Sequence, residues 1–288
     1  MFSACYIGEI SRFARNDMLL SLFTRPSTLG TLGTLNFRHF LKMITFENLT
    51  KIYRGIKAVD SLSLNVPQGT IFGFIGPNGA GKTTTIKMMV GVLQPTRGKI
   101  YINGLDIARE PSKVKRIIGF IPDRPFLYEK LSGIEFLRFM AGLYRMKENR
   151  LDERIADLLS LFELSDWGDE LIESYSHGMK QRLIIASAMI HEPKVIIVDE
   201  PMVGLDPKGA KLVKEVFKEW ANDGATVFMS THTLALAQEI CQKIAIVDKG
   251  RIVASGTSED LKKQAGVEGN LESIFLKITG GQYPGENV

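Results

Sequence analysis

The chain has 288 residues, of which 44% are hydrophobic and 24% charged, values close to the average of globular proteins. This length predicts one or two domains with a sizeable core, and this composition excludes collagen-like, low-complexity and wholly disordered proteins. A net charge of +4 without a long basic run argues against a dedicated nucleic-acid binder, and two cysteines are too few for a disulfide framework or a zinc site, which favours a reducing compartment.

The first 42 residues differ from the rest of the chain. They contain five basic and two acidic side chains, many Ser and Thr residues, and no sustained helical or strand period. This composition is compatible with a transit peptide. We interpret residues 1–42 instead as an extension that is disordered or not native, and we expect the fold to begin at Met43, where strand-like alternation starts.

Apolar patterns after Met43 predict an α/β fold. Leu62, Leu64 and Val66 alternate with polar residues, which is typical of a half-buried strand. Compact apolar runs indicate strands of a parallel sheet buried on both faces; they occupy residues 71–75, 117–121, 195–198 and 226–229. Helical spacing between Leu131 and Phe162 predicts a helical insert, placed at about residues 124–180.

No stretch of the sequence predicts a membrane span. Such a helix needs about 20 mostly apolar residues. The charge-free stretch 61–81 contains Pro67, Pro77 and several glycines, so it cannot form that helix. We therefore expect a soluble chain that reaches a membrane only through a partner.

A glycine-rich loop follows the strand 71–75 and precedes a helical run at 84–90. It matches the G-x-x-x-x-G-K-[ST] pattern, in which glycines let backbone N–H groups converge on phosphate oxygens at the positive end of a helix. Lys82 is predicted to act on the β- and γ-phosphates, and the Thr83 hydroxyl to ligate Mg²⁺. The predicted nucleotide-binding residues of this loop are Gly76, Pro77, Asn78, Gly79, Ala80, Gly81, Lys82, Thr83 and Thr84.

Two adjacent carboxylates end the strand 195–198. Ligands bind at the carboxyl ends of strands in open α/β sheets, and neighbouring side chains on a strand point to opposite sides. Asp199 is therefore predicted to serve Mg²⁺, and Glu200 to polarise the attacking water as the catalytic base.

With these two motifs in place, the sequence from about Met43 to Gly281 resembles the ATP-binding subunit of an ABC transporter. The resemblance implies a P-loop NTPase fold of ABC ATPase type: a mostly parallel sheet, an N-terminal antiparallel β subdomain and a helical insert, with the ATPase domain at 43–280 and a tail at 281–288. Tyr53 matches the aromatic side chain that stacks on adenine in this family. The run Ser230-Thr231-His232 resembles the switch motif, which makes His232 a candidate catalytic residue.

Residues 175–182, Tyr-Ser-His-Gly-Met-Lys-Gln-Arg, resemble the family signature, Leu-Ser-Gly-Gly-Gln followed by Lys/Gln-Arg. The resemblance implies that Ser176, His177 and Gly178 contact ATP held by the opposite subunit. Asp206 lies in a run that resembles the D-loop, and we expect it on the same side.

The sequence departs from the family pattern at three positions. The signature has His177 in place of Gly and Met179 in place of Gln, and the Q-loop position is Asp123 in place of Gln. An aspartate still offers oxygen to Mg²⁺, so Asp123 is retained as a candidate metal ligand, but it adds a charge and loses an amide donor.

The resemblance implies a Mg²⁺-dependent ATPase, with ATP and Mg²⁺ as cofactors, that powers transport from the cytoplasmic face of the membrane. Its expected partners are membrane permease subunits and a second ATPase subunit, identical or related, with no nucleic acid. Residues 269–279 resemble the closing segment of exporter ATPases of the ABC-2 type, which favours export. The alternative is a soluble ABC-type ATPase acting on ribosomes or DNA; a single P-loop and a separation of only 53 positions from Asp123 to Ser176 argue against it.

Overall fold

A computed structural model describes residues 42–280 of the chain, except residues 125 and 148. The predicted extension and tail therefore fall outside the described residues, apart from Lys42. This lysine opens the first strand and pairs with Pro67, one residue before the predicted start of the fold at Met43.

An antiparallel sheet forms the N-terminal part of the described chain. Its strand order is β2-β1-β4-β5, made of β1 (Lys42–Tyr53), β2 (Ile56–Pro67), β4 (Arg97–Ile102) and β5 (Leu105–Asp106). Alternation along β2 buries Leu62, Leu64 and Val66, as their spacing predicts. The antiparallel β subdomain is thereby confirmed.

A six-stranded sheet forms the core, in the order β10-β9-β3-β8-β7-β6. Its strands are β3 (Ile71–Ile75), β6 (Ile118–Ile121), β7 (Val195–Asp199), β8 (Thr226–Thr231), β9 (Lys243–Asp248) and β10 (Arg251–Gly256), and only β10 pairs antiparallel. The register sets Ile75 beside Thr231 and Asp199 beside Ser230. The carboxyl ends of β3, β7 and β8 are therefore aligned. The glycine-rich loop and the Asp199–Glu200 pair consequently come together at the carboxyl-end edge of the sheet.

Aromatic packing joins the two sheets. Phe46 of β1 meets Phe228 of β8 edge-on, with ring centroids 6.2 Å apart, while Phe72 of β3 stacks on Phe228 at 5.8 Å. All three rings are at most 2% exposed. Burial of such rings stabilises each by a few kcal/mol, so the antiparallel sheet is held firmly over the core sheet.

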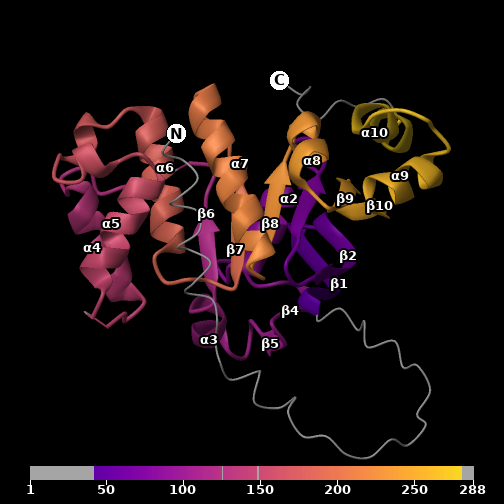
Figure 1. Ribbon diagram of the computed structural model, residues 1–288. Helices are drawn as coiled ribbons and strands as arrows, with labels where there is room; N and C mark the ends of the chain where they lie inside the picture. Colours follow the sequence, from indigo (N-terminus) through magenta and orange to yellow (C-terminus); the bar gives the residue numbers. More distant parts are fainter. Residues whose placement is uncertain (1–41, 125, 148, 281–288) are drawn as a thin grey trace, which may run out of the picture. The chain divides into compact units, whose positions relative to one another are not determined.

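Helices surround the core sheet and extend beyond both of its edges (Figure 1). They are α2 (Lys82–Met89), α3 (Pro111–Lys115), α4 (Gly133–Leu143), α5 (Leu151–Leu161), α6 (His177–Met189), α7 (Pro207–Asn222), α8 (Leu234–Ile240), α9 (Ser258–Ala265) and α10 (Leu271–Thr279), with short 3₁₀ turns η2 (Ser165–Trp167) and η3 (Ile172–Ser174). The helical insert, α4 to α6, lies beside the β6 edge, whereas α9 and α10 lie beside the β10 edge. The predicted α/β fold with a helical insert is confirmed.

Several elements differ by a few residues from the sequence prediction, and two of these differences bear most on the site. Helix α2 begins at Lys82 instead of residue 84, because Gly81 turns the chain into it with φ 99°. Strand β8 continues through Thr231, since Ser230 and Thr231 pair with β7 and β3. Both residues are therefore buried strand residues at the site edge.

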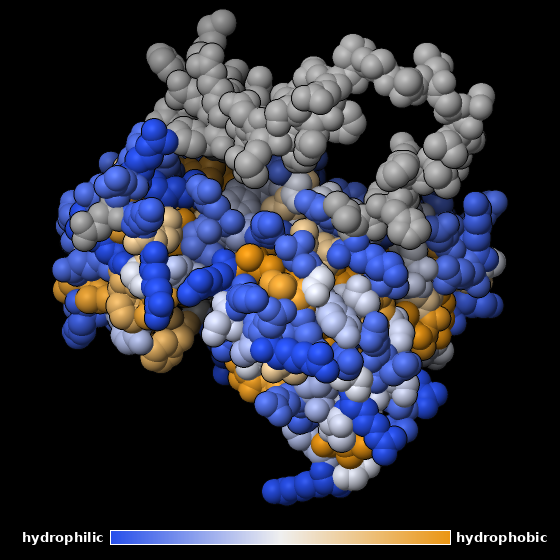
Figure 2. Space-filling view, turned by 90° about the horizontal axis from the view of Figure 1, so that it is seen from below, coloured by the Kyte–Doolittle hydropathy of each residue, from blue (hydrophilic) through white to orange (hydrophobic). Residues whose placement is uncertain are grey.

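None of the helices in the described part of the chain is long and apolar enough to cross a membrane. On the face drawn in Figure 2, hydrophobic side chains form separate patches among hydrophilic ones.

Candidate active site

The glycine-rich loop runs from the end of β3 into α2, as predicted. A Cβ on Gly76 would lie 2.2 Å from the Val247 carbonyl oxygen, and one on Gly81 would lie 2.4 Å from the Ala58 carbonyl oxygen. Any side chain at either position would collide with a neighbouring strand backbone. The close packing holds the loop in one shape, with Asn78 and Gly79 exposed and Pro77 and Ala80 buried beneath them.

Lys82, the first residue of α2, points back into this loop. Its Nζ donates to the carbonyl oxygens of Gly76, at 2.7 Å, and Pro77, at 3.1 Å. Burial lowers the pKa of Lys82, while the carboxylates of Glu200 and Asp199 oppose that change. A desolvated ammonium group close to the loop amides suits binding of an anionic phosphate chain.

Asp199 ends β7 with its side chain almost completely buried, at 4% exposure. It accepts a hydrogen bond from the Ser230 hydroxyl, and the Thr83 hydroxyl lies nearby. Burial raises the pKa of Asp199, with further contributions from the charges of Asp123 and Glu200, so the site gains from a nearby cation. A hydroxyl and a carboxylate side by side are oxygen ligands of the kind that Mg²⁺ takes together with substrate phosphates and water.

Glu200 follows Asp199 in a left-handed backbone conformation, with φ 51°. Such a φ is uncommon outside glycine and occurs often at functional sites. Its Oε1 accepts from the backbone N of His232 at 2.9 Å and from the imidazole Nδ1 at 2.7 Å, and its Oε2 accepts from the Thr231 hydroxyl at 3.1 Å. Three donors therefore hold this carboxylate beside the predicted switch histidine.

Tyr53 is the last residue of β1, at the tip of the β1–β2 hairpin. Its ring is 42% exposed, and the Lys51 ammonium lies 5.3 Å from the ring centroid. An exposed aromatic face of this kind is available for stacking on a base. The structure thus leaves the predicted adenine contact open to a ligand.

The signature residues lie at the start of α6, on the helical insert. Ser176 is the exposed N-cap residue of α6, and its hydroxyl accepts from the Met179 backbone N at 3.3 Å while keeping its own proton free to donate. The His177 ring lies against Gly204, where a Cβ would come within 1.9 Å of the imidazole Cδ2. This packing ties the signature to the predicted D-loop, and no sequence pattern had indicated it.

Asp206 caps the next helix, α7. Its Oδ1 accepts from the Gly209 backbone N at 3.1 Å, and the residue is exposed. Within this chain the Asp206 side chain therefore caps α7, and its role toward an opposite subunit remains a prediction.

Asp123 lies just beyond β6 and is exposed. One carboxylate oxygen accepts from the Arg124 backbone N at 2.8 Å. The charge of Asp123 adds to the effect of burial in raising the pKa of Asp199. Its role as a ligand remains a prediction.

The structure thus brings Lys82, Thr83, Asp199, Glu200 and His232 to one edge of the core sheet. Ser176, His177 and Gly178 belong to a different part of the molecule, the start of α6. Two further residues at that edge, Ser230 and Thr231, were recognised in the sequence only as part of the switch motif. Their hydroxyls hold Asp199 and Glu200, and their place at the end of an apolar strand is the signal that could have assigned this role.

Comparisons with known proteins agree with this geometry. The family model described as ABC transporter matches residues 59–203. The chain is 38% identical to the daunorubicin resistance ATP-binding protein DrrA3 of Streptomyces coeruleorubidus, over 82% of this chain and 74% of that protein. It is 35% identical to the linearmycin resistance ATP-binding protein LnrL of Bacillus subtilis (strain 168), over 78% of this chain and 72% of that protein.

Solved structures are similar as well. An ATP-binding subunit of an ABC transporter superposes with a TM-score of 0.78 at 34% identity, covering 82% of this chain and 99% of that one. The ATP-binding cassette MJ0796, solved as a dimer in a post-hydrolysis state with ADP and Pi, gives a TM-score of 0.69 at 27% identity, covering 75% of this chain and 98% of that one.

Proposed function

This chain belongs to the family of ABC transporter ATP-binding proteins, and on that premise we propose that it hydrolyses Mg²⁺-ATP as one half of a dimer that drives export through separate permease subunits. The division of the site supports this proposal. The residues predicted to bind phosphate and Mg²⁺ and to act as the base lie together at one edge of the core sheet, while Ser176 and His177 of the signature lie exposed at the start of α6.

Each residue of the proposed site has a distinct part in hydrolysis. The loop amides and Lys82 bind the phosphate chain, and Tyr53 stacks on adenine. Thr83 and Asp199 would hold Mg²⁺, which supplies positive charge to the phosphate oxygens. Glu200 accepts the proton of the attacking water, and His232 keeps the carboxylate oriented through its bond to Oε1.

The exposed signature supplies the second side of each site. The free proton of the Ser176 hydroxyl and the backbone N–H of Gly178, at the positive end of α6, are suited to a γ-phosphate held by another subunit. Hydrolysis then requires two subunits to close, which couples the chemistry to a change of shape.

The permease is proposed to dock beside the Q-loop position. A surface hollow of about 620 Å³ lies there, lined by Asp123, Phe126 and Lys180 among others. Phe126 is 77% exposed and stacks edge-on against Tyr128, whose ring in turn meets Phe139 of α4. Exposed aromatic rings with charged neighbours favour a protein partner of amphipathic character.

The direction of transport rests on the relatives. DrrA3 and LnrL are named for resistance to daunorubicin and linearmycin, and resistance by an ATP-binding transport subunit is consistent with export. We therefore infer an exporter that acts from the cytoplasmic face of a membrane.

The variant Glu200→Gln tests the composite site. It removes the base while keeping the shape, so hydrolysis should fall by a factor on the order of 10²–10⁴ while ATP binding persists. With saturating Mg²⁺-ATP the variant should elute as a dimer in size-exclusion chromatography. Glu192→Gln is the control, because this exposed residue shares the positive φ but lies outside the site. A Glu200→Gln protein that binds ATP and stays monomeric would contradict a site shared between two copies.

A further inference from the structure

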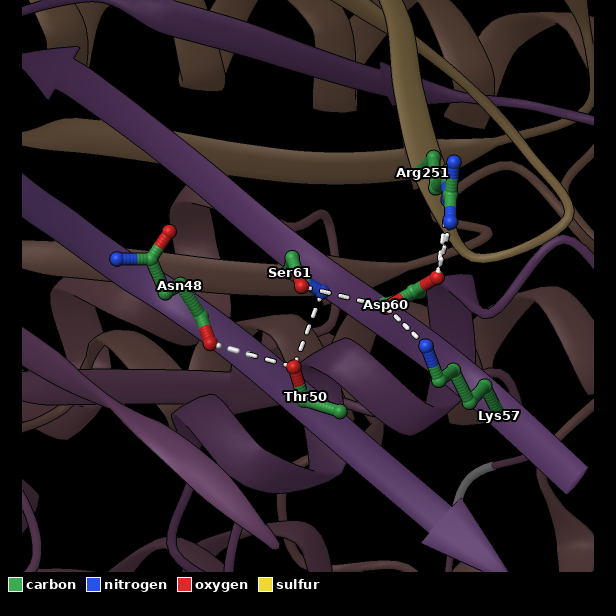
Figure 3. Close-up of polar contacts among 6 residues, drawn as sticks. All are labelled: Asn48, Thr50, Lys57, Asp60, Ser61 and Arg251. Carbon is green, nitrogen blue, oxygen red and sulfur yellow. Dashed lines mark hydrogen bonds and ion pairs between the residues drawn. The ribbon is translucent and has the colours of Figure 1, made fainter. Parts of the chain in front are cut away.

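Asp60 of β2 is the centre of a polar network outside the residues considered so far. Its side chain is 9% exposed. One oxygen accepts from Arg251 Nε at 3.0 Å and Nη2 at 2.5 Å, and the other accepts from Lys57 Nζ at 3.1 Å and the Ser61 hydroxyl at 3.2 Å (Figure 3). Arg251 and then Lys57 lower the pKa of Asp60 to about 2, so this carboxylate remains charged at any physiological pH.

The network continues from Asp60 into β1. Ser61, with φ 53°, donates its backbone N–H to the Thr50 hydroxyl at 3.0 Å, and that hydroxyl donates to the Asn48 carbonyl oxygen at 3.3 Å. Thr50 is 6% exposed and lies three residues before Tyr53. The network therefore fixes the irregular part of the hairpin whose tip carries the predicted adenine contact.

The same stretch of β2 touches the phosphate loop. Asp60 donates its backbone N–H to the Gly250 carbonyl oxygen at 2.9 Å, and Gly250 donates to the Ala80 carbonyl oxygen at 3.0 Å. Two residues before Asp60, the Ala58 carbonyl oxygen lies directly against Gly81. Arg251, the partner of Asp60, follows Gly250 in the chain, so its position is linked to that of Ala80.

We propose that the Asp60–Arg251 ion pair is a positioning clamp that fixes the spacing between the Tyr53 hairpin and the phosphate loop, so that one nucleotide engages both. This inference rests on the proposed ATP site. The pair joins β2 of the antiparallel sheet to β10 of the core sheet, next to the point where Ala58 of β2 and Gly250, just before β10, contact residues 80–81. Asp60 and Arg251 are thus positioning residues, since they act through the loop and the hairpin.

The ligands ATP and inorganic tripolyphosphate separate this role from a purely structural one. ATP spans the hairpin and the loop, whereas tripolyphosphate occupies the loop alone. In Arg251→Gln, the dissociation constant of ATP should rise about fivefold, as expected for a lost contact worth a small fraction of the binding energy, while that of tripolyphosphate stays within about twofold. Arg251→Lys keeps the charge and should recover most of the ATP affinity. Arg251 is 67% exposed, so these variants should fold.

Coupling to Tyr53 provides the second measurement. Tyr53→Ala should weaken ATP binding in the wild-type background. In the Arg251→Gln background it should raise the dissociation constant of ATP by less than about twofold more, because the hairpin is already out of place. Asp60→Asn should behave as Arg251→Gln does. The control is Asp152→Asn, which removes a carboxylate from the exposed ion pair with Arg138 on the insert. It should leave the affinities for ATP and for tripolyphosphate unchanged.

Two results would overturn the clamp. One is an Arg251→Gln protein with a lower melting temperature but unchanged affinity for both ligands, which would make the pair structural. The other is an equal loss of affinity for ATP and for tripolyphosphate, which would show that the ion pair acts on the phosphate loop alone. Failure of the proposed function would look different, because the wild-type chain itself would then bind neither ligand.

Discussion

The two sides of the candidate site differ in how completely one chain builds them. On the sheet-edge side, Lys82 and Asp199 are 8% and 4% exposed, and each is bonded to the groups beside it. On the α6 side, Ser176 and Asp206 are exposed and bond to the backbone of their own helices. Buried, satisfied polar groups are held in place before a ligand arrives, whereas exposed caps leave donors for a partner. The difference supports the proposal that one chain supplies the chemistry and a second chain completes the site.

The largest expected effect comes from removing the Lys82 ammonium group on the sheet-edge side. Lys82→Ala should lower ATP hydrolysis by a factor on the order of 10² or more, because no other ammonium group donates to the Gly76 and Pro77 carbonyls among the described residues. The measurement is steady-state phosphate release at saturating Mg²⁺-ATP. Lys87→Ala, on the exposed face of the same helix, should leave the rate unchanged. Equal rates in both variants would show that this side is not preorganised for phosphate.

The exposed side is tested by comparing two serine helix caps, one inside the signature and one outside it. Ser176 caps α6 in the signature, and Ser132 caps α4 through a capping box with Glu135. Each Ser→Ala change should cost about 1 kcal/mol of stability. Ser176→Ala alone should also lower hydrolysis, by about tenfold, since it removes a phosphate donor. Chemical unfolding and turnover per folded molecule give the two readings, and equal turnover in the two variants would reduce Ser176 to a cap.

A variant of Asp123 tests whether this exposed residue belongs to the sheet-edge side of the site. Asp123→Asn removes a negative charge that adds to the raised pKa of Asp199, so ATP binding should depend less on Mg²⁺, by about 1 kcal/mol. Titrations of ATP with and without Mg²⁺ on wild type and variant measure this. Identical metal dependence in both proteins would identify Asp123 as a solvent-facing loop residue.

The smallest expected effect concerns His191, where the insert rejoins the core sheet. Its Nε2 lies 3.0 Å from the Ile118 carbonyl oxygen, and its ring stacks on Tyr144 of the insert at 3.5 Å. Burial lowers the pKa of His191 to about 4, and the nearby Arg154 adds to that shift. The unfolded chain takes up this proton near pH 6.5 and the folded chain only near pH 4, so stability should fall as the pH drops through that window.

The expected loss is about 1–2 kcal/mol between pH 6.5 and pH 4, reduced by partial exposure of the ring. His191→Phe retains the stack on Tyr144 and should show a smaller loss, although it is less stable at neutral pH because the bond to Ile118 is gone. Urea unfolding at several pH values measures the difference. Parallel pH profiles in the two proteins would show that the insert is not held to the core through a neutral histidine.

Much of this protein could be predicted from short stretches of its sequence. The strand 71–75, the glycine loop and the helix after it are consecutive in the chain, so apolar period and glycine spacing are sufficient to indicate them. The carboxylate pair after the strand 195–198 was predicted for the same reason. Signature and switch motifs could be located by resemblance, because each occupies only a few adjacent residues.

Other features could be identified only in the folded chain. Glu200 and His232 are 32 residues apart in sequence, and Asp60 and Arg251 are 191 residues apart, yet each pair is in direct contact. The left-handed backbone at Glu200 and the packing of His177 on Gly204 likewise have no sequence pattern. Sequence period reports which face of an element is buried, because side-chain direction is set by local backbone geometry. Which elements then lie together depends on sheet order and register, and these are decided by the packing of the whole core.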